Sequence, residues 1–309
     1  MGWTITDMPD QTGRVAVVTG ANGGLGYETA LALAGKGAHV VMAARNRAKA
    51  DAALAAIRTA HPSASIELVE LDLSSQESVR SAAAAIAERH EIIDLLVNNA
   101  GVMAIPERKS VDGFEMQWAT NHLGHYALTA LLLPNVLRAS KGRVVTVSSS
   151  AHHMGWPVSP SSFEGSHRYH PWLAYGRSKL ANFNFGIGLH RLLLGAGAST
   201  ASLISHPGMS NTDLQATSAA ESGGITQRLA HSLTTSAGMT AAQGALTQLR
   251  AATDPGAHSG EFYGPRWVSN GPPVRLPILR RIGLRAAIND LWAVSEAQTG
   301  ITLRVPSQR

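Results

Sequence analysis

A chain of 309 residues, with 44% hydrophobic and only 15% charged residues, can bury a sizeable core, so disordered, collagen-like and coiled-coil classes are disfavoured. The absence of cysteine excludes disulfide frameworks, thiolate catalysis and cysteine-based zinc sites. The net charge of +5 comes from scattered basic residues without a run of five, which argues against nucleic-acid binding and favours a weak attraction for an anionic cofactor.

Short apolar runs alternate with Ala-rich segments of helical length from residue 14 to about residue 205. Continuous apolar runs are typical of strands covered on both faces, as in a parallel sheet with helices on each side. We therefore predict an α/β fold of the doubly wound Rossmann type with a seven-stranded, mainly parallel sheet. The first six strands are expected at 15–19, 39–43, 65–71, 94–98, 143–148 and 200–205. The helices between them are expected near 24–36, 47–60, 75–89, 114–139 and 173–195.

The pattern weakens after Pro207. Residues 209–238 are small and polar, and we interpret them as a flap over the substrate. A helix near 239–252, a short strand at 261–263, a Gly/Pro-rich loop at 264–277 and a helix near 285–298 are expected to follow. We expect one domain over 1–309, with a cofactor-binding and catalytic core at 13–208 and a C-terminal loop and helix within 264–309.

The N-terminus carries no charged segment followed by an apolar core, and no stretch reaches the roughly 18 apolar residues that a membrane span needs. We therefore expect no membrane anchor or span and a cytoplasmic location.

A glycine-rich turn follows the first predicted strand and opens a helix. Backbone that approaches a pyrophosphate needs glycine where a Cβ would collide, and the helix N-terminus attracts the anion. This position predicts a dinucleotide site, although a merely tight turn remains an alternative. The candidate residues are Gly20, Asn22, Gly24, Leu25 and Gly26.

The end of the second strand indicates which ribose is bound. An acidic residue there would accept hydrogen bonds from a 2′-hydroxyl, whereas an arginine pairs with a 2′-phosphate. This chain has Arg45 and Asn46 and no Asp or Glu, so NADP(H) is favoured over NAD(H). A solvated surface arginine is the alternative.

Tyr175 and Lys179 stand four residues apart, on one face of a predicted helix. A positive charge at about 5 Å and an effective dielectric near 20 is worth roughly 3 kcal/mol, which would bring a phenol pKa from about 10 toward neutrality. The pair is therefore a candidate for acid–base catalysis, although an isolated Tyr and Lys at this spacing are usually solvent-exposed residues without a catalytic role.

Two further polar features are candidates. One of the serines 148–150, at the end of the fifth strand, could donate to a developing oxyanion, but the residues alone do not rank the three. Asn121 lies among apolar neighbours in a predicted helix, which hints at a buried polar task or at a satisfied structural amide.

In this order the motifs resemble those of the short-chain dehydrogenase/reductase family, over roughly residues 13–265. The matching residues are the glycine turn at 19–26, Asp72 and Leu73, the Asn98-Asn99-Ala100-Gly101 segment, Asn121, the serines, Tyr175, Lys179, Pro207, Gly208 and Thr212. The resemblance implies an oxidoreductase that interconverts a carbonyl and an alcohol with a nicotinamide cofactor.

The resemblance also implies a role for each residue. Tyr175 would be the proton donor and acceptor, and Lys179 would bind the nicotinamide ribose and lower the tyrosine pKa. Ser149, second in the Val-Ser-Ser stretch, would polarise the substrate oxygen, and the backbone carbonyl of Asn121 would hold a water of the proton relay. Asp72, Leu73, Asn99, Ala100, Gly101, Pro207, Gly208 and Thr212 would line the cofactor, with Asp72 at the adenine and Thr212 at the carboxamide.

Within the family, the chain is most similar to the retinol-dehydrogenase-like and WW-domain-oxidoreductase-like group. This likeness rests on Ala44-Arg45-Asn46, the segment ending at His153, Ser178-Lys179-Leu180-Ala181-Asn182, His206-Pro207-Gly208 and the tail at 291–295. An insert separates Ser149 from Tyr175, and its Trp156, Phe163, Tyr169 and Trp172 are expected to form a wall of the substrate site.

We therefore expect an NADP(H)-dependent oxidoreductase acting on a lipophilic carbonyl or alcohol; the alternative is a non-catalytic NADP(H)-binding sensor or scaffold. The family resemblance implies a homodimer or homotetramer, while the insert and tail leave a monomer open. No metal is expected, because the family that the chain resembles needs no catalytic metal and the spacing of His152, His153, His167 and His170 does not match a metal site.

Overall fold

The computed structural model describes residues 2–163, 168–210, 238–278 and 283–306. An eight-stranded sheet with the order β3-β2-β1-β4-β5-β6-β7-β8 forms its centre. The strands are β1 (Val15–Thr19), β2 (His39–Ala44), β3 (Ile66–Glu70), β4 (Leu95–Asn98), β5 (Arg143–Val147), β6 (Ala201–Ser205), β7 (Phe262–Pro265) and β8 (Pro273–Leu276). The first seven are parallel, and β8 is antiparallel to β7. The predicted doubly wound α/β fold is confirmed.

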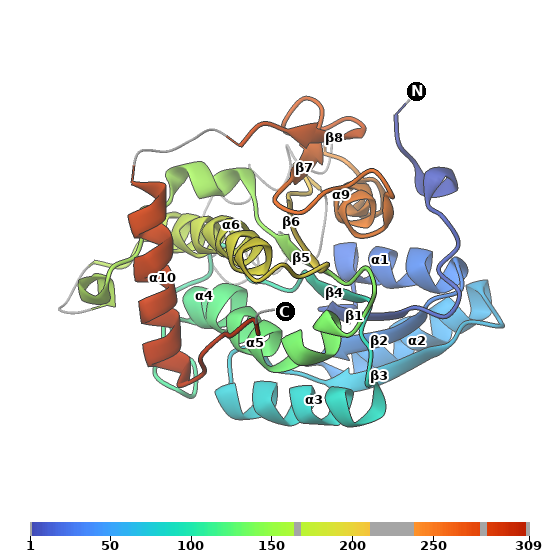
Figure 1. The fold of residues 1–309 in the computed structure, drawn as a ribbon, viewed down its shortest axis with the longest axis horizontal. Helices are drawn as coiled ribbons and strands as arrows, with labels where there is room; N and C mark the ends of the chain where they lie inside the picture. Colours follow the sequence, from blue (N-terminus) through green and yellow to red (C-terminus); the bar gives the residue numbers. More distant parts are fainter. Residues whose placement is uncertain (1, 164–167, 211–237, 279–282, 307–309) are drawn as a thin grey trace.

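Helices cover both faces of the sheet (Figure 1). They are α1 (Gly24–Gly35), α2 (Arg47–Ala60), α3 (Gln76–Arg89), α4 (Met116–Trp118), α5 (Gly124–Leu137), α6 (Pro171–Gly195), α9 (Ala241–Thr253) and α10 (Leu284–Thr299). Val17 of β1 belongs to the apolar cluster with α3, α5, α6 and α10, whereas its neighbours Ala16 and Val18 belong to the cluster with α1, α2 and α9. This alternation explains why the strands are apolar on both faces.

The sheet has eight strands and not the predicted seven. The additional strand, β8, lies in the segment that the sequence analysis interpreted as a loop at 264–277. Its first residue, Pro273, pairs with Pro265 of β7. A strand of four residues that begins with proline is tolerated at a sheet edge, because a missing N–H removes nothing from the interior ladder. Such a strand carries too little periodicity to be recognised from sequence.

The long helix predicted near 114–139 is divided into three parts. Glu115 caps α4 by accepting hydrogen bonds from the backbone N–H groups of Gln117 and Trp118. A π-helical segment, η2 (Ala119–Leu123), then leads into α5. A π-helical turn widens the backbone and often occurs at functional sites. Asn121 lies in its middle.

Short helical turns complete the fold at η1 (Ile5–Asp7), η3 (Ser150–Met154) and η4 (Pro160–Phe163). Most of the predicted flap, residues 211–237, lies outside the described residues. Among the helices that the structure describes, none combines the length and apolarity needed to cross a bilayer.

Candidate active site

The predicted catalytic residues meet at the carboxyl-terminal edge of the sheet, the edge at which folds of this kind bind ligands. The serines follow β5, and Asn99 to Gly101 follow the neighbouring strand β4. Tyr175 and Lys179 come from α6, which packs against η3, β5 and β6. A Cβ added to Gly101 would lie 3.0 Å from Oδ1 of Asn121 and 3.5 Å from Nζ of Lys179. These segments, distant in sequence, therefore converge.

The structure distinguishes between the three serines. Ser148 is buried and donates its hydroxyl to the backbone carbonyl of Lys179 at 2.8 Å, which is a structural role. Ser150 is exposed. Ser149 is partly buried, caps η3 by accepting from the N–H of Ala151, and forms a side-chain hydrogen bond with Tyr175. Of the three, Ser149 has the geometry to act with the tyrosine.

Tyr175 and Lys179 are held by the first turns of α6. The helix begins at Pro171, and the side chain of His170 caps it by accepting from the N–H of Leu173. Both functional side chains are buried. The Lys179 ammonium lies 5.8 Å from the centroid of the Tyr175 ring and donates to the carbonyl of Val147 at 3.2 Å.

Burial controls the acidity of both groups. It raises the pKa of Tyr175 to about 12, against a smaller lowering by the hydrogen bond with Ser149, and it lowers the pKa of Lys179 to about 8. The expectation that Lys179 would bring the Tyr175 pKa toward neutrality is therefore wrong for this structure. Burial disfavours the charged phenolate, and the Ser149 hydrogen bond only partly offsets this rise in the pKa. At neutral pH Tyr175 is a neutral phenol that can donate a proton, and Lys179 is mainly cationic.

Asn121 is completely buried, and its side chain makes three structural hydrogen bonds. Its Oδ1 accepts from the N–H of Val102 at 2.7 Å, while its Nδ2 donates to the carbonyl of Val102 and to Oγ of Ser178 at 2.9 Å each. The side chain thus ties η2 to the segment after β4 and to α6. The backbone carbonyl is the part of Asn121 left for chemistry.

His125, which was not predicted from the sequence, contacts that carbonyl. His125 Nδ1 lies 3.0 Å from the oxygen of Asn121, and its Nε2 lies 2.9 Å from Oγ1 of Thr19. A carbonyl only accepts, so Nδ1 carries the proton. Burial lowers the pKa of His125 to about 4, so the ring is neutral and Nε2 accepts from Thr19. A histidine four residues after Asn121 in an apolar helix was the available signal.

Thr19 extends this network to the predicted cofactor segment. Its Oγ1 accepts from the N–H groups of Asn99 at 2.9 Å and Ala100 at 3.0 Å. The Asn99 amide also donates to the carbonyl of Thr19 and accepts from Gln248 of α9. The Asn99 side chain is therefore structural, and it fixes the position of the backbone at 99–101.

The glycine-rich turn has the shape needed to hold a pyrophosphate. Gly20 has φ +66°, and a Cβ on Gly26 would collide with the carbonyl of Gly20 and the amide of Asn99. Gly23, the N-cap of α1, provides no side-chain acceptor for the N–H groups of the first turn. Free N–H groups at a helix N-terminus bind phosphate. The predicted residues Asn22, Gly24 and Leu25 lie in this turn or at the start of α1, so the cradle fits a dinucleotide.

The adenosine end of the predicted site carries an exposed arginine and a partly exposed aspartate. Arg45 follows β2, and its Nη1 lies 3.7 Å from Oδ2 of Asp72. Asn46 caps α2 by accepting from the N–H of Lys49 at 2.9 Å, so its oxygen has a structural role. Leu73 is buried, which leaves mainly its backbone for ligand contact. Arg45 and Asp72 are thus close enough to contact one nucleoside together.

The insert between η3 and α6 is anchored by two of its aromatic residues. Phe163 packs on Trp118 with ring centroids 4.9 Å apart. Tyr169 donates to the carbonyl of Ile105 at 2.9 Å and accepts from the Gln117 amide at 2.7 Å. The expectation that all four aromatic residues form a wall of the substrate site therefore needs correction, because these two fasten the insert to the core.

The other two aromatic residues of the insert are accessible. Trp172 meets the Tyr175 ring edge-on, with centroids 6.2 Å apart, and Trp156 is 77% exposed. Met154 and Leu173 are also about half exposed. The exposed side chains of the insert and of the start of α6 are consequently apolar at these positions.

The predicted carboxamide-binding segment is partly described. Pro207 accepts from the Ser210 hydroxyl at 2.8 Å, and Gly208 has φ +70°. Thr212 lies outside the described residues.

The described histidines of the group His152, His153, His167 and His170 form hydrogen bonds and ring contacts with protein groups. His152 donates from Nδ1 to the carbonyl of Ser149 at 2.6 Å, and His170 caps α6. His152 and His153 stack on each other with ring centroids 4.0 Å apart, and His152 also stacks on Phe183. His167 lies outside the described residues.

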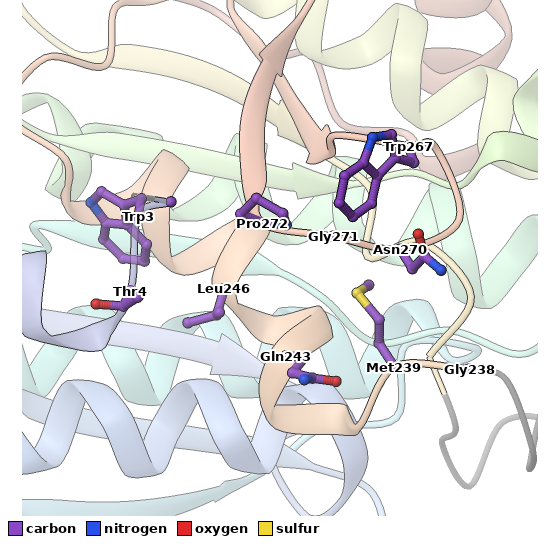
Figure 2. Close-up of a pocket in the computed structure, with 11 residues that line it drawn as sticks. Trp3, Thr4, Gly238, Met239, Gln243, Leu246, Trp267, Asn270, Gly271 and Pro272 are labelled. Carbon is purple, nitrogen blue, oxygen red and sulfur yellow. The ribbon is translucent and has the colours of Figure 1, made fainter.

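A cavity of about 560 Å³ lies away from these side chains (Figure 2). It is formed by the N-terminal segment with Trp3, the first turns of α9, and the loop from Trp267 to Pro272 between β7 and β8. None of the predicted catalytic residues lines it. Proton transfer by Tyr175 therefore cannot take place in this cavity.

Comparison with known proteins indicates a family. The profile of the short chain dehydrogenase family matches residues 14–161. Human retinol dehydrogenase 11 is 42% identical over 202 residues, which are 65% of this chain and 63% of the relative. The match thus spans less than two thirds of the length of that relative.

Two solved structures extend the comparison over more of the chain. A protein of uncharacterized function from Mycobacterium Paratuberculosis is 38% identical with a TM-score of 0.81, covering 99% of this chain and 100% of that one. A candidate NAD(P)-dependent gluconate 5-dehydrogenase from Beutenbergia cavernae, solved with bound NADP, is 26% identical with a TM-score of 0.61. That match covers 79% of this chain and 91% of the other.

Proposed function

Since the chain belongs to the short-chain dehydrogenase family, we propose that it is an NADP(H)-dependent oxidoreductase that interconverts a carbonyl and an alcohol on a lipophilic small molecule. The observation that carries this proposal is the buried group formed by Ser149, Tyr175 and Lys179 at the carboxyl edge of the sheet. A binding protein without turnover has no need to bury a lysine beside a tyrosine that is hydrogen-bonded to a serine.

The residues divide the work of a reduction. The nicotinamide, when bound, supplies the hydride to the carbonyl carbon. Tyr175 donates its phenolic proton to the carbonyl oxygen, for which a neutral phenol is required at working pH. Ser149 donates a hydrogen bond to the same oxygen as negative charge develops there. Lys179 stabilises the resulting phenolate by its positive charge in a site from which water is excluded. Alcohol oxidation is the reverse, with Tyr175 accepting the proton.

The cofactor proposal rests on the cradle and on the charge at the end of β2. The free N–H groups of α1 and the glycines at 20 and 26 would hold the pyrophosphate. Arg45 would pair with a 2′-phosphate, and Asp72 would contact the adenine. The Beutenbergia cavernae structure, described as NAD(P) dependent and solved with NADP at low occupancy, supports binding of this kind of cofactor by analogy. We therefore propose NADP(H) over NAD(H).

The substrate proposal rests on the apolar surface around Tyr175. Trp172 contacts the tyrosine ring, and the exposed Met154, Trp156 and Leu173 lie on the same insert and helix start. Such a surface binds apolar molecules and provides no opposite charge for a charged substrate. The similarity to retinol dehydrogenase 11 is consistent with this substrate class.

Titration with NADPH and NADH, followed by assays of NADPH oxidation with a panel of aldehydes and ketones of increasing chain length, tests the proposal. We expect tighter binding of NADPH and a kcat/KM that rises with apolar chain length. NADPH binding without turnover on any member would refute the enzymatic proposal and support the sensor interpretation. Turnover confined to charged sugar-like substrates would refute only the lipophilic class.

A further inference from the structure

Two histidines and a glutamate form a cluster at the opposite edge of the sheet from the catalytic residues. His39 is the first residue of β2, Glu67 lies near the start of β3, and His90 follows the last turn of α3. These elements are neighbours in the fold (Figure 1). One ligand atom from each side chain lies within 4.8 Å of the other two.

The sheet register explains the meeting of these side chains. Glu67 pairs with Val41 of β2, so His39, two residues earlier, points to the same face as Glu67. That face is covered by α3, whose C-cap is His90. Nε2 of His90 lies 2.7 Å from Oε1 of Glu67, and Nε2 of His39 lies 3.8 Å from the same oxygen. All three side chains are partly buried.

One atom of the cluster lacks a partner. Nε2 of His39 is buried and makes no hydrogen bond within the described part of the chain, since 3.8 Å to Glu67 is too long. Nδ1 of His39 lies 2.7 Å from Oγ of Ser65. In the tautomer with the proton on Nδ1, that nitrogen donates to Oγ of Ser65, and the Nε2 lone pair is directed toward the glutamate. Two acceptors then face each other, an arrangement that a cation between them would satisfy.

We propose that Nε2 of His39, Oε1 of Glu67 and Nε2 of His90 bind a Zn²⁺ ion, with water as the fourth ligand. Two imidazoles and one carboxylate are a donor set that zinc uses, and bond lengths near 2.0–2.1 Å imply ligand separations of about 3.3 Å in a tetrahedron. The separations of 2.7 and 3.8 Å lie on either side of that value. A displacement of about half an ångström in each side chain would create the geometry.

Arg89 competes with this ion. Its Nη1 donates to Oε2 of Glu67 at 2.7 Å, which leaves Oε1 for the metal but places a positive charge beside it. The arginine side chain is 43% exposed and can move into solvent. Replacement of Arg89 by a neutral residue should therefore strengthen zinc binding, a gain that damage to the fold would not produce.

The position of the cluster indicates a structural site. β3 is the outermost strand on its side of the sheet, and the ion would join it to β2 and α3. Because parallel strands place their carboxyl ends at the opposite edge, the ion would not touch Tyr175 or the cofactor cradle. The site would thus stabilise the fold without entering the reaction.

Metal binding is measured on the full-length protein after treatment with EDTA and dialysis. Zn²⁺ titration against a chromophoric chelator should show one tight equivalent, and Co²⁺ should give the visible bands of a four-coordinate site. Zn²⁺ should also raise the Tm, because an ion that binds only the folded state stabilises it. The absence of cysteine means that no thiolate can contribute to these signals.

Four variants identify the site. His39→Ala and His90→Ala should each weaken Zn²⁺ binding at least about a hundredfold and abolish the Tm increase, since each loses a direct ligand. His258→Ala, at an exposed histidine, is the matched control and should bind as the parent does. Arg89→Gln should bind Zn²⁺ about tenfold more tightly.

Three results would overturn the proposal. They are the absence of a tight Zn²⁺ equivalent in the parent protein, retention of that equivalent in His39→Ala and His90→Ala, and weaker binding in a folded Arg89→Gln variant. Circular dichroism of each apo variant identifies any that fails to fold. If neither alanine variant folds, the Zn²⁺ titration of Arg89→Gln tests the proposal.

Discussion

The ammonium of Lys179 lies 5.8 Å from the ring centroid of Tyr175, one helical turn further along α6, and donates to the carbonyl of Val147 at 3.2 Å. This hydrogen bond to the last residue of β5 therefore fixes the position of the lysine side chain relative to the tyrosine ring. Because both groups are buried, their pKa values differ between the folded and unfolded states. A change in the protonation of either group therefore affects the stability of the fold as well as the activity.

The first prediction concerns the pH dependence of reduction. Burial lowers the pKa of Lys179 to about 8 and raises that of Tyr175 to about 12, so the lysine loses its charge first as pH rises. We expect kcat for carbonyl reduction to be level between pH 6 and 7.5 and to fall about tenfold per pH unit above pH 8. Stopped-flow measurement at saturating NADPH tests this profile. A profile level to pH 10 would contradict the role of the lysine charge.

The second prediction concerns stability at the same residue. A lysine pKa lowered in the folded state means that the folded protein binds protons less readily than the unfolded chain, so the lysine contribution to stability rises between pH 8 and 10.5. At pH 7 the charged, buried lysine is destabilising. Lys179→Met should therefore raise the free energy of unfolding at pH 7 by about 1–2 kcal/mol, allowing for the lost hydrogen bond, while abolishing turnover.

Urea denaturation at pH 7 and pH 10 measures this effect. The gain over the parent should shrink at pH 10, where the folded parent no longer carries the charge. A gain of equal size at both pH values would show that packing, and not charge, is responsible.

The third prediction removes the phenol. Tyr175→Phe should lower kcat by at least about a thousandfold, since no other group at the substrate oxygen can deliver the proton, and should leave the NADPH Kd within about threefold. Tyr263→Phe is the matched control, because that hydroxyl donates to Glu261 beside β7. Substantial turnover by Tyr175→Phe would remove the tyrosine from its proposed role.

The sequence predicted most of the fold because the inner strands are apolar on both faces and the glycine turn has a local pattern. Where it failed, the determinants were not local. β8 is a strand only because β7 offers a pairing partner. The π-helical turn at Asn121 depends on hydrogen bonds to Val102 and Ser178, which are distant in sequence.

The candidate site shows the same division. The resemblance selected Ser149, and the structure explains the choice because Ser148 is used by the Lys179 carbonyl. Spacing alone suggested that Lys179 would acidify Tyr175, but spacing contains no information about burial, and desolvation reversed the direction. His125 was missed because its partners, Thr19 and the Asn121 carbonyl, become visible only in three dimensions.

The fourth prediction concerns cofactor choice. Arg45→Asp replaces the cation proposed to pair with the 2′-phosphate by a group that repels phosphate and can accept from a 2′-hydroxyl. The ratio of kcat/KM for NADPH to that for NADH should fall about a hundredfold or more. Arg138→Asp is the control, since Arg138 has similar exposure and pairs with Glu91 away from the cofactor cradle. An unchanged ratio in Arg45→Asp would place the phosphate elsewhere.

The fifth prediction tests the network around the Asn121 carbonyl. That oxygen has two lone pairs, one of which is occupied by Nδ1 of His125. The family resemblance assigns a relay water to the same oxygen. His125 is thus a positioning residue, which fixes the carbonyl and, through Thr19, the backbone at 99–100.

His125→Leu should lower kcat about tenfold and cost about 1–3 kcal/mol of stability, because it leaves the carbonyl and the Thr19 hydroxyl without their partner. His125→Gln has an amide donor and should recover part of kcat. The decisive measurement is the solvent deuterium isotope effect on kcat, which should increase in His125→Leu if proton delivery is slowed. A purely structural role would lower stability and leave that isotope effect unchanged.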